Sequence, residues 1–426
     1  MSILKSAVTL FLLCTSLCFN IASANPPQAE NAELQTMLEQ LIQEQNIPGV
    51  VVTYGFDNQP LQTIAAGFSN ISAKTPMQNQ TQFMIGSVTK SFISAAILQE
   101  VAAGKMNVDE SLQSIAKQYG GEIASVVKTY PATAPITLRE LLDHTSGVHD
   151  DVNTSIFTQA FMKDPKKVWT DQELLAIALP HPFYFKPGTK GVFSYTNTDY
   201  LLLSIVLKSA THHSLGQTFQ QLFTQADLTG IYYPENGVIP PDIFSNMALG
   251  YMSLNDSNPL RVAFQDAPVV TIPGISKLQA YELYNDATIP DPSAGGLISS
   301  TENMAKWYRA LFQNGNILPP AELQMMLHGG VPNGKYNQAH YGFGVATNVI
   351  PPYGYIVSHN GQMPGYTAIV FYFFQSHLVV AAAINSSQSD FLDPFDYSTG
   401  KPAPGLFSTI IPVLLKEQTV HSKMLN

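Results

Sequence analysis

The sequence predicts an α+β fold in which an antiparallel sheet is built from the two ends of the chain and a helical region is inserted between them. Strand-like runs lie near the N-terminus, within residues 50–68, and near the C-terminus, within 341–385. Between them, several segments carry apolar residues three and four positions apart, which is the spacing of a helix. Strands at both ends with helices between them favour a sheet to which both termini contribute.

Two periodicities assign the individual elements. Helical spacing predicts helices at residues 33–45, 87–103, 199–210 and 301–314. Runs of β-branched and aromatic residues predict strands at residues 50–56, 61–68, 366–374 and 378–384. Turn-forming sequences join the strands of each pair, at 57–60 and 375–377, so two hairpins are expected.

The C-terminal segment 406–415 is apolar but contains Pro412, which is expected to interrupt a helix. We expect this segment to pack on its own domain. The longest apolar runs fall short of the roughly 20 residues that a spanning helix needs. No integral membrane segment is therefore predicted.

The first 24 residues have the features of a secretory signal peptide. Lys5 is followed by the uncharged, largely apolar stretch 6–24, which ends in Ala22-Ser23-Ala24. Cleavage between Ala24 and Asn25 would leave residues 25–426 as a secreted or periplasmic protein. Both cysteines, Cys14 and Cys18, would leave with the signal. The mature chain would then have neither a disulfide nor a thiol nucleophile.

Composition excludes several classes of function. The 426-residue chain has 21 basic and 31 acidic residues, for a net charge of -10, and only 12% of its residues are charged. A nucleic-acid-binding protein needs a basic surface to neutralise phosphates. Nucleic acid is therefore not an expected partner, and small molecules are.

Ser87-Val88-Thr89-Lys90 is the first candidate for catalysis. A serine in the first turn of a helix and a lysine three residues later share one face, which places an amine beside a hydroxyl. The same spacing occurs at Ser2, Ser114 and Ser125, but only Ser87 follows a glycine and opens a strongly apolar helix. The alternative for Ser87 is an ordinary helix-capping serine.

Tyr195-Thr196-Asn197 is the second candidate and precedes a predicted helix. A phenol can pass a proton, and an amide side chain can bind a substrate carbonyl or hold a neighbouring lysine. Taken alone, this motif is better explained by a packed tyrosine followed by a capping asparagine.

His359-Asn360-Gly361-Gln362 is the third candidate and follows a strand-like run. A glycine at 361 would let a substrate lie against the strand edge, where backbone N–H groups can stabilise an oxyanion.

The three motifs, in this order, resemble the serine penicillin-recognising family. The branch in question contains class C β-lactamases, D-alanyl-D-alanine carboxypeptidases of the actinomycete type and related esterases. Segments 141–147, 294–301 and 341–344 strengthen the resemblance. It implies a five-stranded antiparallel sheet flanked by helices, at about residues 30–85 and 300–426, and a helical subdomain at about 105–295, together forming one β-lactamase-like catalytic domain.

The resemblance also implies a role for each residue of the motifs. Ser87 would be the nucleophile, and Lys90 with Tyr195 would accept its proton and return it to the leaving group. Asn197, His359, Gly361 and Gln362 would bind substrate, with the N–H groups of Ser87 and Gln362 forming the oxyanion hole. No cofactor and no metal are implied. His144 is expected in a structural loop, and Tyr341 is expected to shape the sheet.

The preferred function is that of an exported serine hydrolase that forms an acyl-enzyme and acts as a D-alanyl-D-alanine carboxypeptidase on peptidoglycan peptides. Two alternatives remain: a β-lactamase or small-ester hydrolase, and a sensor that binds penicillin or muropeptide without turnover. In this branch the carboxypeptidases carry an arginine that binds the substrate carboxylate. Here that stretch is Val345-Ala346-Thr347-Asn348, which leaves His359 as a candidate cation.

Overall fold

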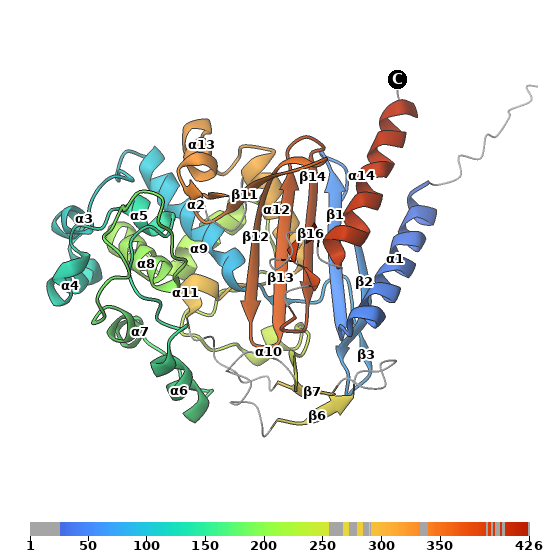
Figure 1. Cartoon of the computed structure of the whole chain (residues 1–426), viewed down its shortest axis with the longest axis horizontal. Helices are drawn as coiled ribbons and strands as arrows, with labels where there is room; N and C mark the ends of the chain where they lie inside the picture. The colour runs from blue at the N-terminus through green and yellow to red at the C-terminus, as the bar shows by residue number, and fades with distance from the viewer. Residues whose placement is uncertain are drawn as a thin grey trace, which may run out of the picture.

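The structure is a computed structural model that describes residues 26–254, 267–271, 279–283, 289, 291–332, 340–388, 391–392, 395–396, 401–402 and 405–424. The predicted signal peptide, residues 1–24, lies outside them. A nine-stranded antiparallel sheet forms the centre of the molecule, in the order β3-β2-β1-β14-β13-β12-β11-β10-β9 (Figure 1). Both ends of the chain contribute to it, so the predicted α+β architecture is confirmed.

The expected number of strands, five, is wrong. The strands of the sheet are β1 (Gly49–Phe56), β2 (Gln62–Asn70), β3 (Thr75–Pro76), β9 (Val331–Pro332), β10 (His340–Tyr341), β11 (Ala346–Ile350), β12 (Gly354–Met363), β13 (Tyr366–Phe373) and β14 (Leu378–Ile384). Three of them, β3, β9 and β10, have two residues each. A segment of two residues has no periodicity, so sequence patterns do not detect it.

Helices cover both faces of the sheet (Figure 1). The longer ones are α1 (Pro26–Gln45), α2 (Thr89–Ala102), α8 (Asn197–Thr211), α9 (Leu215–Gln225), α12 (Thr301–Phe312) and α14 (Leu406–Met424). The shorter ones are α3 (Leu112–Tyr119), α4 (Gly121–Thr129), α5 (Leu138–Leu142), α6 (Ser155–Lys163), α7 (Asp171–Ala178), α10 (Pro241–Phe244), α11 (Pro292–Gly295) and α13 (Pro320–His328). One face of the sheet carries α1 and α14, and the helical region lies on the other side.

The inserted region is not purely helical. It also holds a small three-stranded sheet of β5 (Tyr251–Ser253), β7 (Gln279–Glu282) and β6 (Val269–Thr271), in that order. The other short elements are β4 (Phe83–Met84), β8 (Ile298–Ser299), β15 (Phe395–Asp396), β16 (Lys401–Pro402) and the 3₁₀ turns η1 (Gly86–Val88) and η2 (Pro131–Thr133). The pair β4 and β8 lies next to the entry into η1.

The alternation of side chains along β14 builds two separate cores. Val379, Ala381 and Ala383 face the helical region, where they join α2 and α12 in the larger core. The intervening residues Leu378, Val380, Ala382 and Ile384 face α1 and α14. A strand that is buried on both faces reads as a continuous apolar run, and that run is what predicted β14.

The C-terminal helix packs on its own domain, as predicted, but Pro412 does not end it. A proline inside a helix removes one hydrogen bond and costs about 3 kcal/mol. On both sides of it, Phe407, Ile411 and Leu414 are buried against the sheet. Their burial offsets the cost and keeps the helix continuous.

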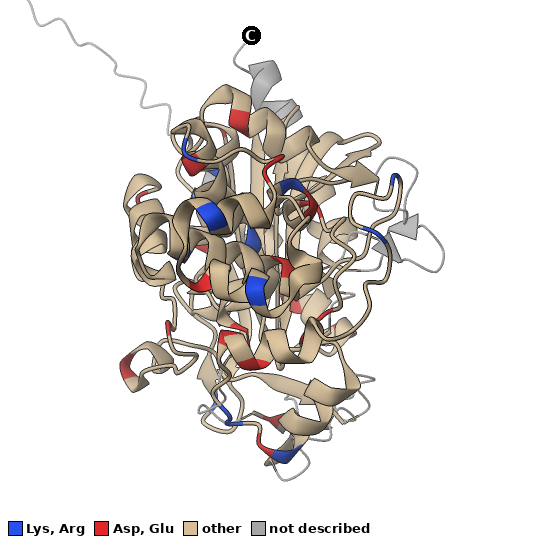
Figure 2. Ribbon diagram, turned by 90° about the vertical axis from the view of Figure 1, so that its left-hand side faces the viewer, with Lys and Arg blue, Asp and Glu red and all other residues tan. Residues whose placement is uncertain are grey.

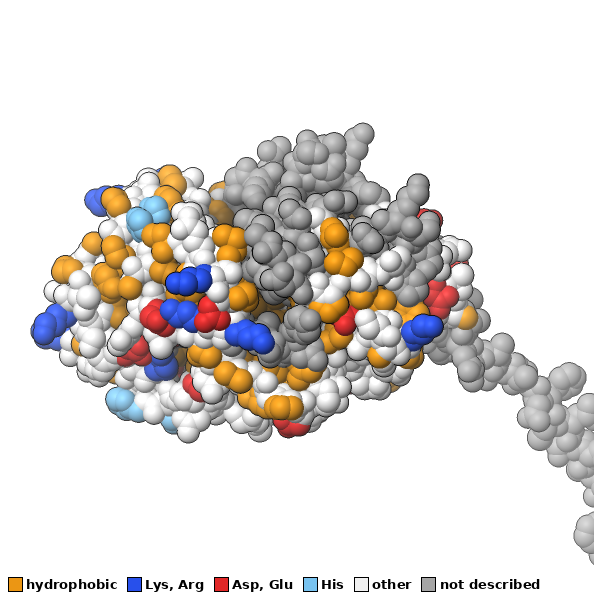
Figure 3. Space-filling view, turned by 90° about the horizontal axis from the view of Figure 1, so that it is seen from below, with side chains coloured by type: hydrophobic (Ala, Val, Ile, Leu, Met, Phe, Trp, Pro, Cys, Tyr) orange, Lys and Arg blue, Asp and Glu red, His pale blue; other side chains and the backbone are white. Residues whose placement is uncertain are grey.

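Charged groups are sparse and mixed on the surface. Seen toward the helical region, the positions of basic and acidic residues along the ribbon are scattered among each other (Figure 2). From below, the same region again shows the two signs side by side (Figure 3). The described residues on these two faces therefore form no continuous basic surface. In the described part of the chain, no helix is both long and apolar enough to cross a membrane.

Candidate active site

Ser87 lies in η1, between the buried strand β4 and the helix α2. Gly86 makes the turn possible because its φ is +51°, in the left-handed region that glycine tolerates. A Cβ on Gly86 would also lie 2.6 Å from the Gln362 nitrogen. The turn that carries Ser87 is therefore pressed directly against β12, and the two predicted oxyanion donors, the N–H groups of Ser87 and Gln362, lie at this junction.

Gly361 contributes to the same close approach. A Cβ at 361 would lie 1.9 Å from the Ile85 oxygen and 2.8 Å from the Ser87 nitrogen. We expected this glycine to make room for substrate. The missing side chain makes room for the turn that carries Ser87, and the binding of substrate against this strand edge stays a prediction. Strand β11 pairs with β12 only as far as Ser358, so the stretch 359–363 has no ladder partner on that side among the described residues.

Lys90 is completely buried and makes three hydrogen bonds. Its Nζ lies 3.1 Å from the Ser87 Oγ, 2.8 Å from the Asn197 Oδ1 and 3.0 Å from the Ala294 carbonyl oxygen. The first two motifs predicted from the sequence therefore meet at the lysine. An ammonium has three N–H donors, and each of them has one acceptor here.

Asn197 is the first residue of α8, and both ends of its side-chain amide are occupied. Its Oδ1 accepts from Lys90, and its Nδ2 lies 3.3 Å from the Asp150 Oδ2. We expected Asn197 to bind the substrate. Within the protein, its amide connects Lys90 to a buried carboxylate, and its role in binding substrate stays a prediction.

Tyr195 lies beside the lysine. The Lys90 Nζ is 4.9 Å from the centre of its ring. Its hydroxyl is buried and has no hydrogen-bond partner in the described part of the molecule. The phenol is thus free to bond to a reacting group, as a proton relay requires.

His359 is buried and uses both ring nitrogens. Its Nδ1 lies 2.5 Å from the Asn360 carbonyl oxygen, and its Nε2 lies 2.9 Å from the Tyr341 hydroxyl. Because a carbonyl only accepts, Nδ1 carries the proton and Nε2 accepts from Tyr341. Burial, and then the charge of Lys90, lower the pKa of His359 to about 3. His359 is therefore neutral at ordinary pH and does not supply the cation that the sequence suggested.

A second histidine, His144, lies behind Tyr195, with 4.3 Å between the ring centres. Its Nδ1 is 2.8 Å from an oxygen of Asp199, and both side chains are fully buried. Burial lowers the pKa of His144 and raises the pKa of Asp199. Burial thus disfavours the charged form of both groups, and His144 lies in the loop that follows α5, where a structural role was expected.

Three contributors to the site were not predicted from the sequence. Asp150 binds Asn197, and the carbonyl of Ala294 binds Lys90. Asp291 caps α11, the helix that carries Ala294, by accepting from the Ala294 N–H at 3.2 Å. Burial raises the pKa of Asp291 to about 6. The available signals were an aspartate directly before Pro292 and an aspartate just after Ser146-Gly147, both of which also fit ordinary turns.

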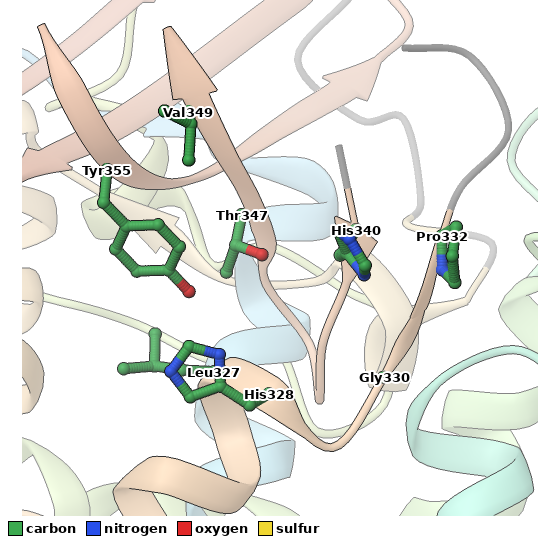
Figure 4. A pocket seen from close by; sticks show the side chains of 8 residues that line it. All are labelled: Leu327, His328, Gly330, Pro332, His340, Thr347, Val349 and Tyr355. Carbon is green, nitrogen blue, oxygen red and sulfur yellow. The ribbon is translucent and has the colours of Figure 1, made fainter. Parts of the chain in front are cut away.

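A separate pocket of about 420 Å³ lies toward the other end of β12 (Figure 4). Its lining consists of Leu327, His328, Gly330, Pro332, His340, Thr347, Val349 and Tyr355. None of the predicted site residues is among them. Because alternate residues of a strand share a face, Tyr355 lies on the same side of the sheet as His359, four residues away. The pocket therefore lies on the same side of the sheet as His359, but it is separate from the site around Ser87 because it shares no lining residue with that site.

Several known proteins share this fold. A D-amino acid amidase from Ochrobactrum anthropi SV3 superposes with a TM-score of 0.72 at 21% identity, covering 92% of this chain and 99% of that one. A D-stereospecific amidohydrolase from Streptomyces sp. gives a TM-score of 0.66 at 22% identity, covering 84% and 94%. A penicillin binding protein from Bacillus halodurans gives 0.63 at 22%, covering 83% and 95%. At these identities the similarity shows the fold.

Sequence comparison points the same way. The chain is 23% identical over 348 residues to penicillin-binding protein 4* of Bacillus subtilis, covering 80% of this chain and 69% of that protein. It is 24% identical over 310 residues to a β-lactamase of Escherichia coli K12, covering 70% and 65%. It is also 22% identical to the protein flp of Staphylococcus aureus, of which it spans 63%. The chain thus spans about two thirds of the length of these relatives.

The family model described as Beta-lactamase matches residues 34–399, which is most of the chain. This match includes Ser87, Lys90, Tyr195, Asn197 and His359, the residues on which the resemblance was based. The predicted resemblance is confirmed. The chain belongs to the Beta-lactamase family, whose members include serine hydrolases of the penicillin-binding and β-lactamase type.

Proposed function

We propose that this chain is an exported serine hydrolase that works through a covalent acyl-enzyme on Ser87. The observation that carries this proposal is the surroundings of Lys90, whose Nζ lies near the Ser87 hydroxyl and two carbonyl oxygens. A neutral amine has two hydrogens and one lone pair. Since carbonyl oxygens only accept, the two hydrogens point to them and the lone pair faces the Ser87 hydroxyl. Export is proposed from the signal-like residues 1–24.

The reaction begins when the Ser87 Oγ attacks the acyl carbon of the substrate and its proton passes to Lys90. The substrate oxygen becomes an oxyanion, which the N–H groups of Ser87 and Gln362 stabilise. The bond to the leaving group breaks as Tyr195 and Lys90 return a proton to it. A water molecule then attacks the acyl carbon, releases the acid and restores the Ser87 hydroxyl.

The charge of the residues beside Ser87 limits which substrates the site can recognise. Recognition of a free terminal carboxylate needs a charge-assisted donor. His359 is neutral at ordinary pH, and Ala346 lies in the stretch where related carboxypeptidases have arginine. We therefore propose substrates that are recognised without a free carboxylate, namely amides, peptides or esters. The fold shared with a D-amino acid amidase makes amides of D-amino acids the first compounds to test.

A D-alanyl-D-alanine carboxypeptidase is the second candidate, because relatives named as penicillin-binding proteins match most of the chain. A β-lactamase and a sensor without turnover complete the alternatives. A time course with a fluorescent penicillin, run beside a D-amino acid amide, a nitrophenyl ester and a D-Ala-D-Ala peptide, separates them. We expect hydrolysis of the amide and the ester. Permanent label with no hydrolysis of any compound would identify a sensor and overturn the proposal.

The protonation of His359 gives a further prediction. Because its pKa is lowered to about 3, the side chain stays uncharged from pH 5 to pH 8. We expect the ratio of D-Ala-D-Ala peptide cleavage to ester cleavage to stay constant over this range. We also expect Ala346→Arg to raise peptide cleavage selectively, by about 10-fold or more, since a charge-assisted hydrogen bond contributes roughly 1.5–3 kcal/mol. A ratio that rises toward the peptide as pH falls through 6.5 would show that His359 does bind the carboxylate as a cation.

A further inference from the structure

Asp150 lies in the loop between α5 and α6, and its buried carboxylate faces the start of α8. Its Oδ2 accepts from the backbone N–H of Asn197 at 2.9 Å and from the Asn197 Nδ2 at 3.3 Å. Its Oδ1 accepts from the Asn153 N–H at 2.8 Å. Every one of these partners is a donor, as a carboxylate requires.

These contacts leave one orientation for the Asn197 amide. In the orientation present, Nδ2 donates to Asp150 and Oδ1 accepts from Lys90. Turned by half a rotation, the amide would place its oxygen against the carboxylate and its two N–H groups against the amine. Two acceptors would then meet at Asp150 and lose their hydrogen bond, and two donors would meet at Lys90 as long as it is an ammonium.

The amide orientation matters because of what it does to Lys90. Once Lys90 is the neutral amine that the proposed mechanism requires, its two hydrogens bond to the Asn197 oxygen and the Ala294 carbonyl and so point away from Ser87. A turned amide would instead offer a hydrogen to the lone pair of Lys90 and compete with the Ser87 hydroxyl for it. The carboxylate that fixes the amide therefore also decides where the lone pair points.

We propose that Asp150 is a positioning residue of the reaction, which holds the Asn197 amide with its oxygen toward Lys90 and so directs the lysine lone pair to Ser87. This inference rests on the proposed function, because it assumes that Lys90 takes the proton of Ser87. Asp150 does not touch the reacting atoms and acts only through Asn197 and Lys90.

Asp150 has a second role, which the test must separate from the first. Thr196, the N-cap of α8, makes no side-chain capping bond, and the Asp150 carboxylate accepts the first N–H of the helix in its place. A carboxylate at this end of a helix is stabilising. Loss of Asp150 therefore lowers stability whether or not it positions Asn197, so stability alone is not a sufficient readout.

Exchanging the side chains of residues 150 and 197 separates the positioning of the amide from the stabilisation of α8. In Asp150→Asn, the new amide can donate to the Asn197 oxygen and let that amide turn, and we expect kcat for the ester to fall 10-fold to 100-fold with little change in KM. In Asn197→Asp, two carboxylates face each other, and we expect a similar loss. The double variant places an amide at 150 and a carboxylate at 197, so an oxygen again faces Lys90. We expect it to recover at least 10-fold over the weaker single variant.

The exchange leaves the other groups around Lys90 unchanged. Among the described residues, titratable side chains that interact with it electrostatically include His144, Asp199, Asp291 and His359. Because the exchange moves a negative charge next to the amine, the four proteins are compared at the plateau of their pH profiles. Asp143→Asn is the matched control, since Asp143 is a buried carboxylate at the start of the same loop, and its side chain accepts hydrogen bonds from the backbone N–H and the hydroxyl of Thr145. We expect its kcat to stay within about twofold of the parent.

Two outcomes overturn the inference. One is an exchange variant that folds but is no more active than the weaker single variant. The other is an Asp150→Asn protein with the kcat of the parent. Failure of the proposed function looks different: Ser87→Ala, assayed in parallel, would then retain ester hydrolysis. If Ser87→Ala is inactive and the exchange shows no recovery, only the role of Asp150 is disproved.

Discussion

Ser87→Ala is expected to lose at least about 10⁴-fold in the rate of acylation by any ester, amide or penicillin, because loss of the nucleophile removes the covalent step entirely. Ser87 is also the serine whose hydroxyl lies 3.1 Å from the buried amine of Lys90. The measurement is the rate of ester hydrolysis and of penicillin labelling by purified protein. Thermal unfolding of the variant should match the parent, since the change removes one small polar atom.

Two serines with the same spacing to a lysine provide controls. Ser114 is exposed on α3 and bonds to Glu110, and Ser125 is exposed on α4. Alanine at either position should leave the rates unchanged. A Ser87→Ala protein that still hydrolyses the ester at the parent rate would show that another residue is the nucleophile.

Lys90→Arg is expected to lose about 10²-fold to 10⁴-fold in acylation rate, the range that a general base contributes. A guanidinium stays protonated in proteins, so it has no lone pair to offer the Ser87 hydroxyl. The buried position leaves little room for the longer side chain, so Lys90→Met is measured beside it as a smaller, uncharged replacement. Both should be nearly inactive while their circular dichroism spectra remain those of a folded protein.

The two replacements distinguish a base from a source of positive charge. Activity above about a tenth of the parent in Lys90→Arg is a loss of less than 1.4 kcal/mol in the barrier, and would mean that Lys90 acts by its charge. Equal losses in both variants support proton transfer, since neither side chain accepts a proton.

Sequence patterns predicted the long elements well, because each has a period that burial requires. Helices at 87–103 and 199–210 and the hairpin of β13 and β14 lie within a few residues of their expected bounds. The two-residue strands β3, β9 and β10 were missed because pairing with a neighbouring strand, and not local sequence, defines them. Pro412 was misread because the apolar contacts on both sides of it come from the sheet.

The residues of the candidate site were also predicted only in part. The resemblance identified Ser87, Lys90 and Asn197, which meet although Asn197 is 107 residues from Lys90. Asp150 was not identified, because its contact with α8 depends on how the loop after α5 packs. The state of His359 was misjudged for a related reason: its burial under Tyr341 is set by tertiary packing, and burial is what lowers its pKa.

Catalysis through a covalent acyl-enzyme on Ser87 is tested most directly by mass spectrometry of the trapped intermediate. The protein is mixed with the nitrophenyl ester, quenched in acid at short times and weighed intact, and the digested protein is then searched for the modified peptide. We expect one added acyl group per chain, located on Ser87 and absent from Ser87→Ala. An adduct on any other residue, or rapid hydrolysis of the ester with no adduct at any time, would contradict catalysis through an acyl-enzyme on Ser87.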